Sequence, residues 1–461
     1  MAYTTINKGS LYINTVLYSG NNTSQSITGV GFQPDWVWLK ERNGTEAHNL
    51  YDSNRGIFKR LSSNTTGAEY SSNTQLTAFG NDGFSVGSSD AINDAGNTMV
   101  GWNWKAGGTA PAQTYSVKVV SDSGNKYRFD DFGTSAVTIN LQEGGTYTFD
   151  QSDSSNNGHP LRFATQANGA NSSQYTTGVT TNGTPGQAGA YTRITVAASA
   201  PTLFYYCTAH SGMGGQANTN TTFGSSNFSG SIQSTVSASP TAGFSIVSWT
   251  GSGSNATIGH GLGSVPKMII VKNREAVTNW IVGGSLIEDV GGSTNNYLLL
   301  NTNAGMDSAT TLYASYNTDT IGVKADANIN GSGNGMLAYC FAEIKGYSKF
   351  GSYVGNGSAD GPFIYTGFKP AFVLIKKSNA SGTDWQLTDN KRDLHNVCTH
   401  RLLPNDSIAE QTDSLDLDIL SNGFKIRKSS TTNNASGATY IYLAFAENPF
   451  VGSDGTPVTA R

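Results

Sequence analysis

Charged side chains are scarce in this chain. They make up 13% of its 461 residues, about half of the roughly 25% found in an average soluble domain. Lys and Arg number 28 and Asp and Glu number 32, which leaves a net charge of −4. A protein that neutralises phosphates needs a surplus of cations, so no nucleic-acid partner is expected.

Cysteine and long apolar runs are equally rare. Three cysteines exclude a fold built on a disulfide framework. The longest apolar runs, at 203–207 and 265–271, are far shorter than the roughly 20 residues that span a bilayer, so no membrane insertion is expected. The first residues lack a basic segment followed by an unbroken apolar one, so the sequence predicts no secretory signal and synthesis into a cytosol.

Glycine and short apolar clusters are what the chain does have. Glycine supplies 55 positions, and 37% of the residues are hydrophobic. Apolar clusters of this kind argue against wholesale disorder and predict folded cores joined by many turns. Because one domain usually takes about 100 to 200 residues, the length predicts three or four domains.

Three segments of the chain share one layout. Each opens with an aromatic residue two positions before a glycine, and these residues are Tyr18, Trp249 and Tyr353. A proline, five residues and a lysine follow, at 34–40, 266–272 and 370–376. A glycine, a polar pair and an alternating strand close the copies, at 96–104, 333–341 and 437–445. Short strands bounded by turn residues predict an antiparallel β-sandwich for each copy.

The first and third copies carry an Asp-x-x-Arg pair that the middle copy lacks. The pairs are Asp52 with Arg55 and Asp389 with Arg392. Such a pair can clamp a ligand, but a structural ion pair is the favoured interpretation. No paired carboxylates or histidine clusters recur in the copies, so the chain is not expected to be an enzyme, and a glycan-directed hydrolase ranks last.

Two further sets of residues in the copies have alternative interpretations. The lysines that end the proline-to-lysine segments are expected at solvated or edge positions, and they are Lys40, Lys272 and Lys376. Four alternating tryptophans form a sugar-stacking platform if they are exposed, or fill one face of a sandwich if they are not. They are Trp36, Trp38, Trp102 and Trp104. Carbohydrate binding by the first copy is therefore a hypothesis.

The segment between the first and second copies has a different pattern. It contains His159, Cys207, His210 and Met213, and the last three follow an aromatic strand with the spacing Cys-x2-His-x2-Met. One thiolate and two imidazoles with a weak axial thioether are the ligands of a type 1 copper site. This spacing predicts that the four residues bind one copper ion. The alternative is a sandwich of the same shape in which they serve only packing and turns.

This segment resembles the cupredoxin family. The likeness rests on INLQEGGTYTFD at 139–150, GHPLRF at 158–163 and YTRITVAASAPTLFYYCTAHSGM at 191–213. It implies a Greek-key β-sandwich in which the same four residues hold copper. Pro160 departs from the family pattern because it has no amide hydrogen to support the site. A long polar loop at 166–188 is a second departure, and it shields the site or mediates contacts.

The rest of the chain resembles structural proteins of tailed bacteriophages, marine ones in particular. The likeness rests on the opening residues 1–43, on 267–274, on 345–377, on NGFKIR at 422–427 and on TYIYLAFAENPF at 439–450. It implies location in a virion assembled in the host cytoplasm. A symmetric homo-oligomer, other virion proteins and a host surface glycan or receptor are the partners expected of such a protein.

Together these observations predict an all-β protein of tandem antiparallel β-sandwich repeats with an inserted cupredoxin-like domain. The expected domains are repeat 1 at 1–110, the insert at 111–222, repeat 2 at 223–346 and repeat 3 at 347–461. The expected function is that of a surface-exposed tail-fibre or capsid-decoration protein that presents host-adhesion modules. Copper-dependent electron transfer or metal sequestration by the insert is the alternative.

Overall fold

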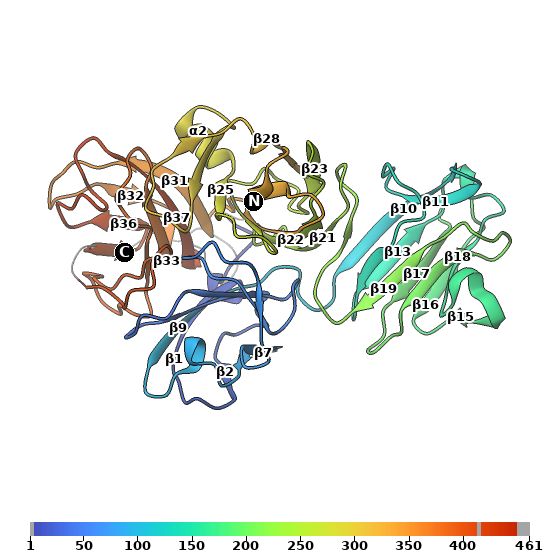
Figure 1. The fold of residues 1–461 in the computed structure, drawn as a ribbon, viewed down its shortest axis with the longest axis horizontal. Coiled ribbons are helices and arrows are strands. Elements are labelled where there is room, and N and C mark those ends of the chain that lie inside the picture. The colour runs from blue at the N-terminus through green and yellow to red at the C-terminus, as the bar shows by residue number, and fades with distance from the viewer. Residues whose placement is uncertain (1–3, 413–415, 450–461) are drawn as a thin grey trace.

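A computed structural model gives the structure of the chain and describes residues 4–412 and 416–449. The fold is all-β, with antiparallel sheets in every repeat and only short helices, which confirms the predicted fold class (Figure 1). The end of the third predicted repeat, residues 450–461, lies outside the described residues.

Each repeat forms two facing sheets. In the first repeat the sheet orders are β1-β9-β3-β4 and β2-β8-β7. Its elements are η1 (Gly9–Leu11), β1 (Ile13–Ser19), β2 (Gln25–Thr28), β3 (Trp36–Glu41), β4 (Asn49–Asp52), β5 (Lys59–Arg60), β6 (Tyr70–Ser71), β7 (Leu76–Gly80), β8 (Gly83–Val86), α1 (Asp90–Asn93) and β9 (Thr98–Trp104).

The third repeat has the same two sheets, and the second enlarges one of them. The third repeat consists of β31 (Ser348–Val354), β32 (Phe363–Tyr365), β33 (Phe368–Lys377), β34 (Gln386–Asp389), β35 (Leu417–Leu420), β36 (Gly423–Ile426) and β37 (Thr439–Pro449). The second consists of β20 (Ser225–Asn227), β21 (Ser234–Ser239), β22 (Phe244–Thr250), β23 (Ala256–Gly259), β24 (Met268–Asn273), β25 (Ile281–Gly283), α2 (Ser285–Gly291), β26 (Asn296–Leu299), β27 (Asp307–Ser308), β28 (Tyr313–Tyr316), β29 (Thr320–Val323), α3 (Ala327–Asn330) and β30 (Gly335–Phe341).

The three repeats pack around one shared apolar core. The sheets that contain β3, β24 and β33 each direct one face toward the other two repeats, and the side chains of these faces form a single cluster. Trp36 of the first repeat stacks on Tyr339 of the second at 4.4 Å between ring centroids, and Trp104 meets Phe372 of the third at 5.3 Å. The strands that close the repeats are therefore buried on both faces, one inside their own sandwich and one in this core.

The shared core overturns the hypothesis of a tryptophan platform for sugars. The side chains of Trp36, Trp38, Trp102 and Trp104 are each at most 1% exposed. Alternation along β3 and β9 places them on one sheet face, as predicted, but the other two repeats cover that face. They cannot stack on a glycan in the folded protein.

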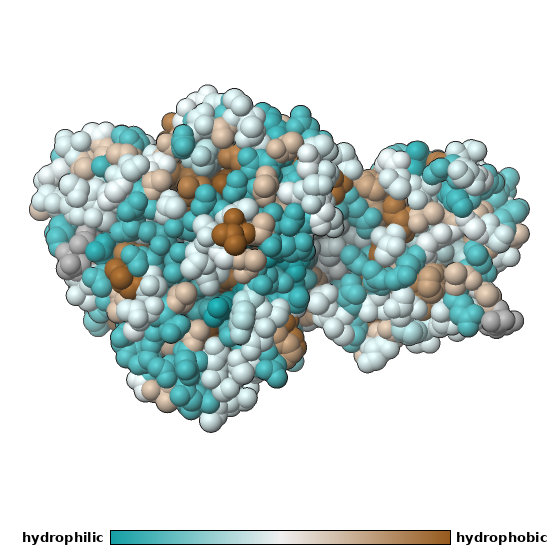
Figure 2. Space-filling model, viewed as in Figure 1, coloured by the Kyte–Doolittle hydropathy of each residue, from teal (hydrophilic) through white to brown (hydrophobic). Residues whose placement is uncertain are grey.

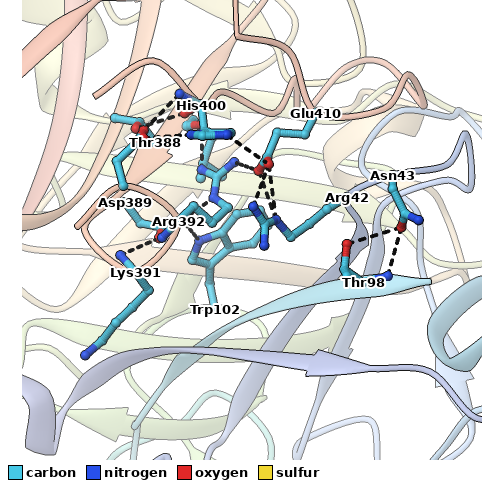
Figure 3. Close-up of polar contacts among 12 residues, drawn as sticks. Arg42, Asn43, Thr98, Trp102, Thr388, Asp389, Lys391, Arg392, His400 and Glu410 are labelled. Atoms are coloured by element: carbon cyan, nitrogen blue, oxygen red, sulfur yellow. Dashed lines mark hydrogen bonds and ion pairs between the residues drawn. The ribbon is translucent and has the colours of Figure 1, made fainter. Parts of the chain in front are cut away.

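Both Asp-x-x-Arg pairs are ion pairs buried at the contacts between repeats. Arg392 donates to Asp389 at 2.6 Å, and the indole Nε1 of Trp102, from the first repeat, donates to the same carboxylate at 2.9 Å (Figure 3). Burial by itself raises the pKa of the Asp389 carboxyl, but the Arg392 guanidinium outweighs it and holds the pKa below its usual value. In the first repeat, Asp52 pairs with Arg55 and accepts from the Tyr339 hydroxyl of the second repeat at 2.8 Å.

A glutamate joins each of these pairs to an arginine of the neighbouring repeat. Glu410 binds Arg392 at 2.9 Å and Arg42 of the first repeat at 2.7 Å (Figure 3). Glu69 binds Arg55 at 3.1 Å and Arg274 of the second repeat at 2.9 Å. The first–third and first–second contacts thus each contain a charged network with the same arrangement of residues.

The second–third contact replaces this network with uncharged residues. Met306 donates its backbone N–H to the Ser378 carbonyl, as Glu69 does to Arg274 and Glu410 does to Arg42. The strand register and these hydrogen bonds show which residues stand at the equivalent positions. Gly284 takes the place of the Asp, Ile287 that of the Arg and Met306 that of the Glu. Ser378 takes the place of the neighbouring arginine, and Leu443 that of the indole or phenol donor. Because a buried charge without its partner is costly, the whole set is exchanged together.

The three repeat lysines are buried, which contradicts the expectation of solvated or edge positions. Their ammonium groups donate to backbone carbonyls of the following turn or of the neighbouring repeat, for example from Lys40 to Glu41, from Lys272 to Thr66 and from Lys376 to Thr383. Burial lowers the pKa of each lysine to about 8. The flexible stem of lysine carries the charge to these carbonyls, which a strand-end position in the sequence does not reveal.

The insert is a sandwich of two five-stranded sheets with its own apolar core. The sheet orders are β11-β10-β13-β17-β16 and β12-β19-β18-β14-β15, and each sheet contains one parallel pair. Its elements are β10 (Ala112–Ser121), β11 (Asn125–Phe129), β12 (Ile139–Gln142), β13 (Thr146–Asp150), η2 (Ser154–Asn156), β14 (Leu161–Ala164), η3 (Ala167–Ser172), β15 (Gln174–Tyr175), β16 (Val179–Asn182), β17 (Tyr191–Thr195), β18 (Leu203–Cys207) and β19 (Gln216–Asn220).

The insert stands to one side of the three repeats but is firmly joined to them (Figure 1). Phe228, beyond the predicted boundary at 222, packs in the core of the insert, although β20 just before it pairs with β21 of the second repeat. Gln142 donates to the Gly108 carbonyl and accepts from the Gly224 N–H, so it ties both connecting segments. The predicted domain boundaries themselves stay a prediction.

The first testable consequence concerns the charged network. Arg392→Met leaves the Asp389 carboxylate buried without its cation, so we expect the free energy of unfolding to fall by roughly 3–5 kcal/mol. The Asp389→Asn, Arg392→Met double variant removes both charges and keeps an oxygen that accepts from Trp102. It should be more stable than the single variant in urea unfolding. Lys267→Met, at an exposed pair with Asp289, is the control and should change stability by less than about 0.5 kcal/mol. A double variant no more stable than Arg392→Met would contradict this account.

Candidate metal centre

Two neighbouring strands of the insert bring the predicted ligands together. Strand β18 ends at Cys207, which lies opposite Leu161 at the start of β14. His159 precedes Leu161 by two residues, so it reaches the end of β18 from the adjacent strand. His210 and Met213 lie in the turn that leads from β18 to β19.

The ligand atoms form a compact group. The Sγ atom of Cys207 lies 3.8 Å from Nδ1 of His159 and 3.8 Å from Nδ1 of His210. Candidate ligand atoms of the three residues all lie within 4.8 Å of one another. Metal–sulfur and metal–nitrogen bonds of roughly 2.3 and 2.0 Å separate S and N by roughly 3.5–3.7 Å at tetrahedral to trigonal angles, close to the distances found here, so one ion fits between these atoms.

Burial differs among the four predicted ligands. Cys207 and Met213 are buried and belong to the same apolar cluster, whereas His210 is exposed. The imidazole rings of His159 and His210 lie 4.6 Å apart between centroids. Burial and then the neighbouring His210 lower the pKa of His159 below 6.5, which favours the neutral imidazole that a metal needs.

The donor set favours a soft metal. One cysteine sulfur and two imidazoles suit copper or zinc, and a thioether nearby shifts the preference toward copper, while magnesium and calcium prefer oxygen. Of the four predicted ligands, the structure places His159, Cys207 and His210 in one group. Met213 lies buried beside them at the end of the same turn.

The turn that carries His210 and Met213, here called the ligand turn, is held by hydrogen bonds that the sequence did not reveal. Thr208 donates its N–H to the Pro160 carbonyl, and the Gly212 N–H donates to Asn168 Oδ1. Asn168 lies in η3, inside the long polar loop, so part of that loop contacts the ligand turn. No sequence signal marks Asn168, because its contact joins segments 44 residues apart.

The candidate metal centre lies at the end of the insert that points away from the repeats. Strand β10 begins at Ala112 beside the repeats, and parallel β13 runs with it from Thr146 to Asp150. His159 follows β13 in the chain and therefore lies near the end far from the repeats. Strand β19 returns to the repeats and β18 runs antiparallel to it, so Cys207 at the end of β18 lies at the same far end. The exposed His210 therefore faces away from the repeats.

Few large hydrophobic side chains of the described residues are exposed. Figure 2 shows mostly polar and neutral residues on the viewed face, with scattered hydrophobic ones. Among the described residues, the exposed large hydrophobic side chains all belong to the repeats. No helix in the described part of the chain has the length and apolarity to cross a membrane.

Comparison with known proteins identifies the family but no function. Residues 8–130 and 216–449 match the family described as a domain of unknown function (DUF7483), and because this is well over half of its length, the chain belongs to that family. No curated protein and no solved structure matches the chain. All four predicted ligands lie between the two matched segments.

The environment of His159 predicts its titration in the metal-free protein. We expect an NMR midpoint below 6.5, and a higher midpoint in His210→Ala, because that change removes a neighbouring ring. The folded state then binds this proton less readily than the unfolded chain, so the stability that His159 contributes is present above about pH 6.5 and is lost as the pH falls through the folded pKa. A midpoint at or above 6.5 would contradict this.

Proposed function

We propose that the insert is a cupredoxin-like module that would hold one copper ion through His159, Cys207 and His210, with Met213 as a fourth, weaker ligand. The observation that carries the proposal is the placement of both Nδ1 atoms 3.8 Å from the Cys207 sulfur. A copper ion held in this way supplies one-electron transfer. The chain's own residues supply the sulfur, the two imidazoles and the apolar packing behind the sulfur.

A second proposal concerns the repeats. We propose that they form a non-enzymatic structural component of a tailed-phage virion, attached to the tail or the capsid, that holds the insert outward. The resemblance of the repeats to phage structural proteins motivates it. A body closed around one shared core, with few charges and a docked insert, suits a rigid particle component. Homo-oligomers, other virion proteins and a host surface receptor or glycan are the partners this role implies.

Copper binding is tested on the purified full-length protein loaded with Cu(II). We expect about one copper per chain and an intense visible charge-transfer band from a copper-bound thiolate. Cys207→Ser should abolish the band. Cys398→Ser is the matched control: Cys398 is also buried, and a serine can keep its hydrogen bond to Asn396, so this variant should retain copper and band. Absence of both from the unaltered protein would end the copper proposal.

The virion proposal is tested on particles. Mass spectrometry and immunogold labelling of purified virions from cells that express the gene should find the chain on the particle surface. Ultracentrifugation of the purified protein should give a multiple of 48.5 kDa. A chain that is absent from particles and remains a single copy at high concentration would contradict the proposal.

A further inference from the structure

Pro160 raises a structural question that the rest of the insert answers. Proline has no amide hydrogen, so the residue after His159 cannot donate a hydrogen bond that would anchor this side of the metal centre. The His159 backbone must be fixed by other groups if its imidazole is to hold a defined position. The hydrogen bonds around residues 159–161 show which groups do so.

Gln151 brackets Pro160 from the end of β13. Its Nε2 donates to the His159 carbonyl at 2.9 Å, and its Oε1 accepts from the Leu161 N–H at 3.1 Å. The side chain is buried, so these bonds do not compete with water. One amide therefore binds the residues on both sides of the proline.

Tyr127 connects the two ligand-bearing segments to each other. Its hydroxyl donates to the His159 carbonyl at 2.9 Å, and its backbone N–H donates to the Met213 carbonyl at 2.9 Å. The residue lies in β11 and has no exposed surface. Burial, followed by the nearby Cys207, raises the pKa of the Tyr127 hydroxyl. Tyr127 therefore bonds to both segments, whereas the Gln151 side chain bonds to residues on either side of Pro160.

We propose that Tyr127 is a positioning residue of the metal centre, which spaces His159 from the Cys207–Met213 turn in place of the amide that Pro160 lacks. The proposal rests on the copper-binding function proposed above. The Tyr127 side chain acts as a spacer between its bonds to His159 and Met213, because its rigid ring is buried in the insert core and holds the hydroxyl at a set distance from the backbone N–H. Loss of the hydroxyl leaves the ring packed and frees the His159 carbonyl from one of its two side-chain donors.

The test compares Tyr127→Phe with Tyr115→Phe in the full chain. Tyr115 is a matched control: it is equally buried in the same core, and its hydroxyl donates to a backbone carbonyl, that of Ser226, at 2.8 Å, but it contacts neither ligand segment. Both variants lose one buried hydrogen bond, so their stabilities should fall alike. Only Tyr127→Phe should weaken Cu(II) binding, by about 10-fold in competition with a chelator, and alter the shape of the charge-transfer band.

Hydrogen exchange of the metal-free proteins supplies a readout that needs no copper. We expect faster exchange at the Leu161 and Thr208 amides in Tyr127→Phe than in Tyr115→Phe, because Leu161 follows His159 and Pro160 and donates to Gln151, and Thr208 donates to the Pro160 carbonyl. Unchanged copper affinity and band shape in Tyr127→Phe would overturn the proposal, even if the unaltered protein binds copper. If the unaltered protein binds no copper, the function proposed above fails on its own, and unchanged exchange at these two amides would overturn the positioning role as well.

Discussion

The apolar sheet faces of the three repeats are buried against one another, and the rest of the body depends on that contact. The first repeat contributes four tryptophans to this contact and the other two repeats contribute further apolar side chains, so burial of all three faces removes a large apolar area from water. The contact also removes water from polar groups at its edges, and each of these groups then needs a hydrogen-bond or ion-pair partner. Two of the three contacts solve this with an Asp–Arg–Glu network, and the third removes the charges altogether.

The same constraint explains how the insert can be carried without disturbing the body. The connecting segments follow β9 and precede β20, and the insert buries a core separate from that of the repeats. Gln142 and Phe228 join the two parts through hydrogen bonding and packing rather than through a free tether. The candidate metal centre is consequently held at a defined place, at the far end of a docked sandwich.

Much of the candidate site was predictable because its chemistry is local in sequence. Cys207, His210 and Met213 lie within seven residues, and the Leu161–Cys207 pairing brings in His159 from the next strand. The supporting residues were not predictable. Tyr127, Gln151 and Asn168 act through hydrogen bonds to backbone atoms of other segments, and a tyrosine or an amide at those positions carries no pattern of its own.

The sequence by itself determined the all-β class, the threefold repetition and the ligand types, because turn residues, strand alternation and side-chain chemistry are local properties. Only the tertiary structure decided which faces are inside. Alternation along β3 and β9 places the tryptophans on one face but does not say whether water or another repeat lies against it. The buried lysines and the exchange of a charged network for Gly284, Ile287 and Met306 have the same origin, since burial depends on contacts between residues far apart in the chain.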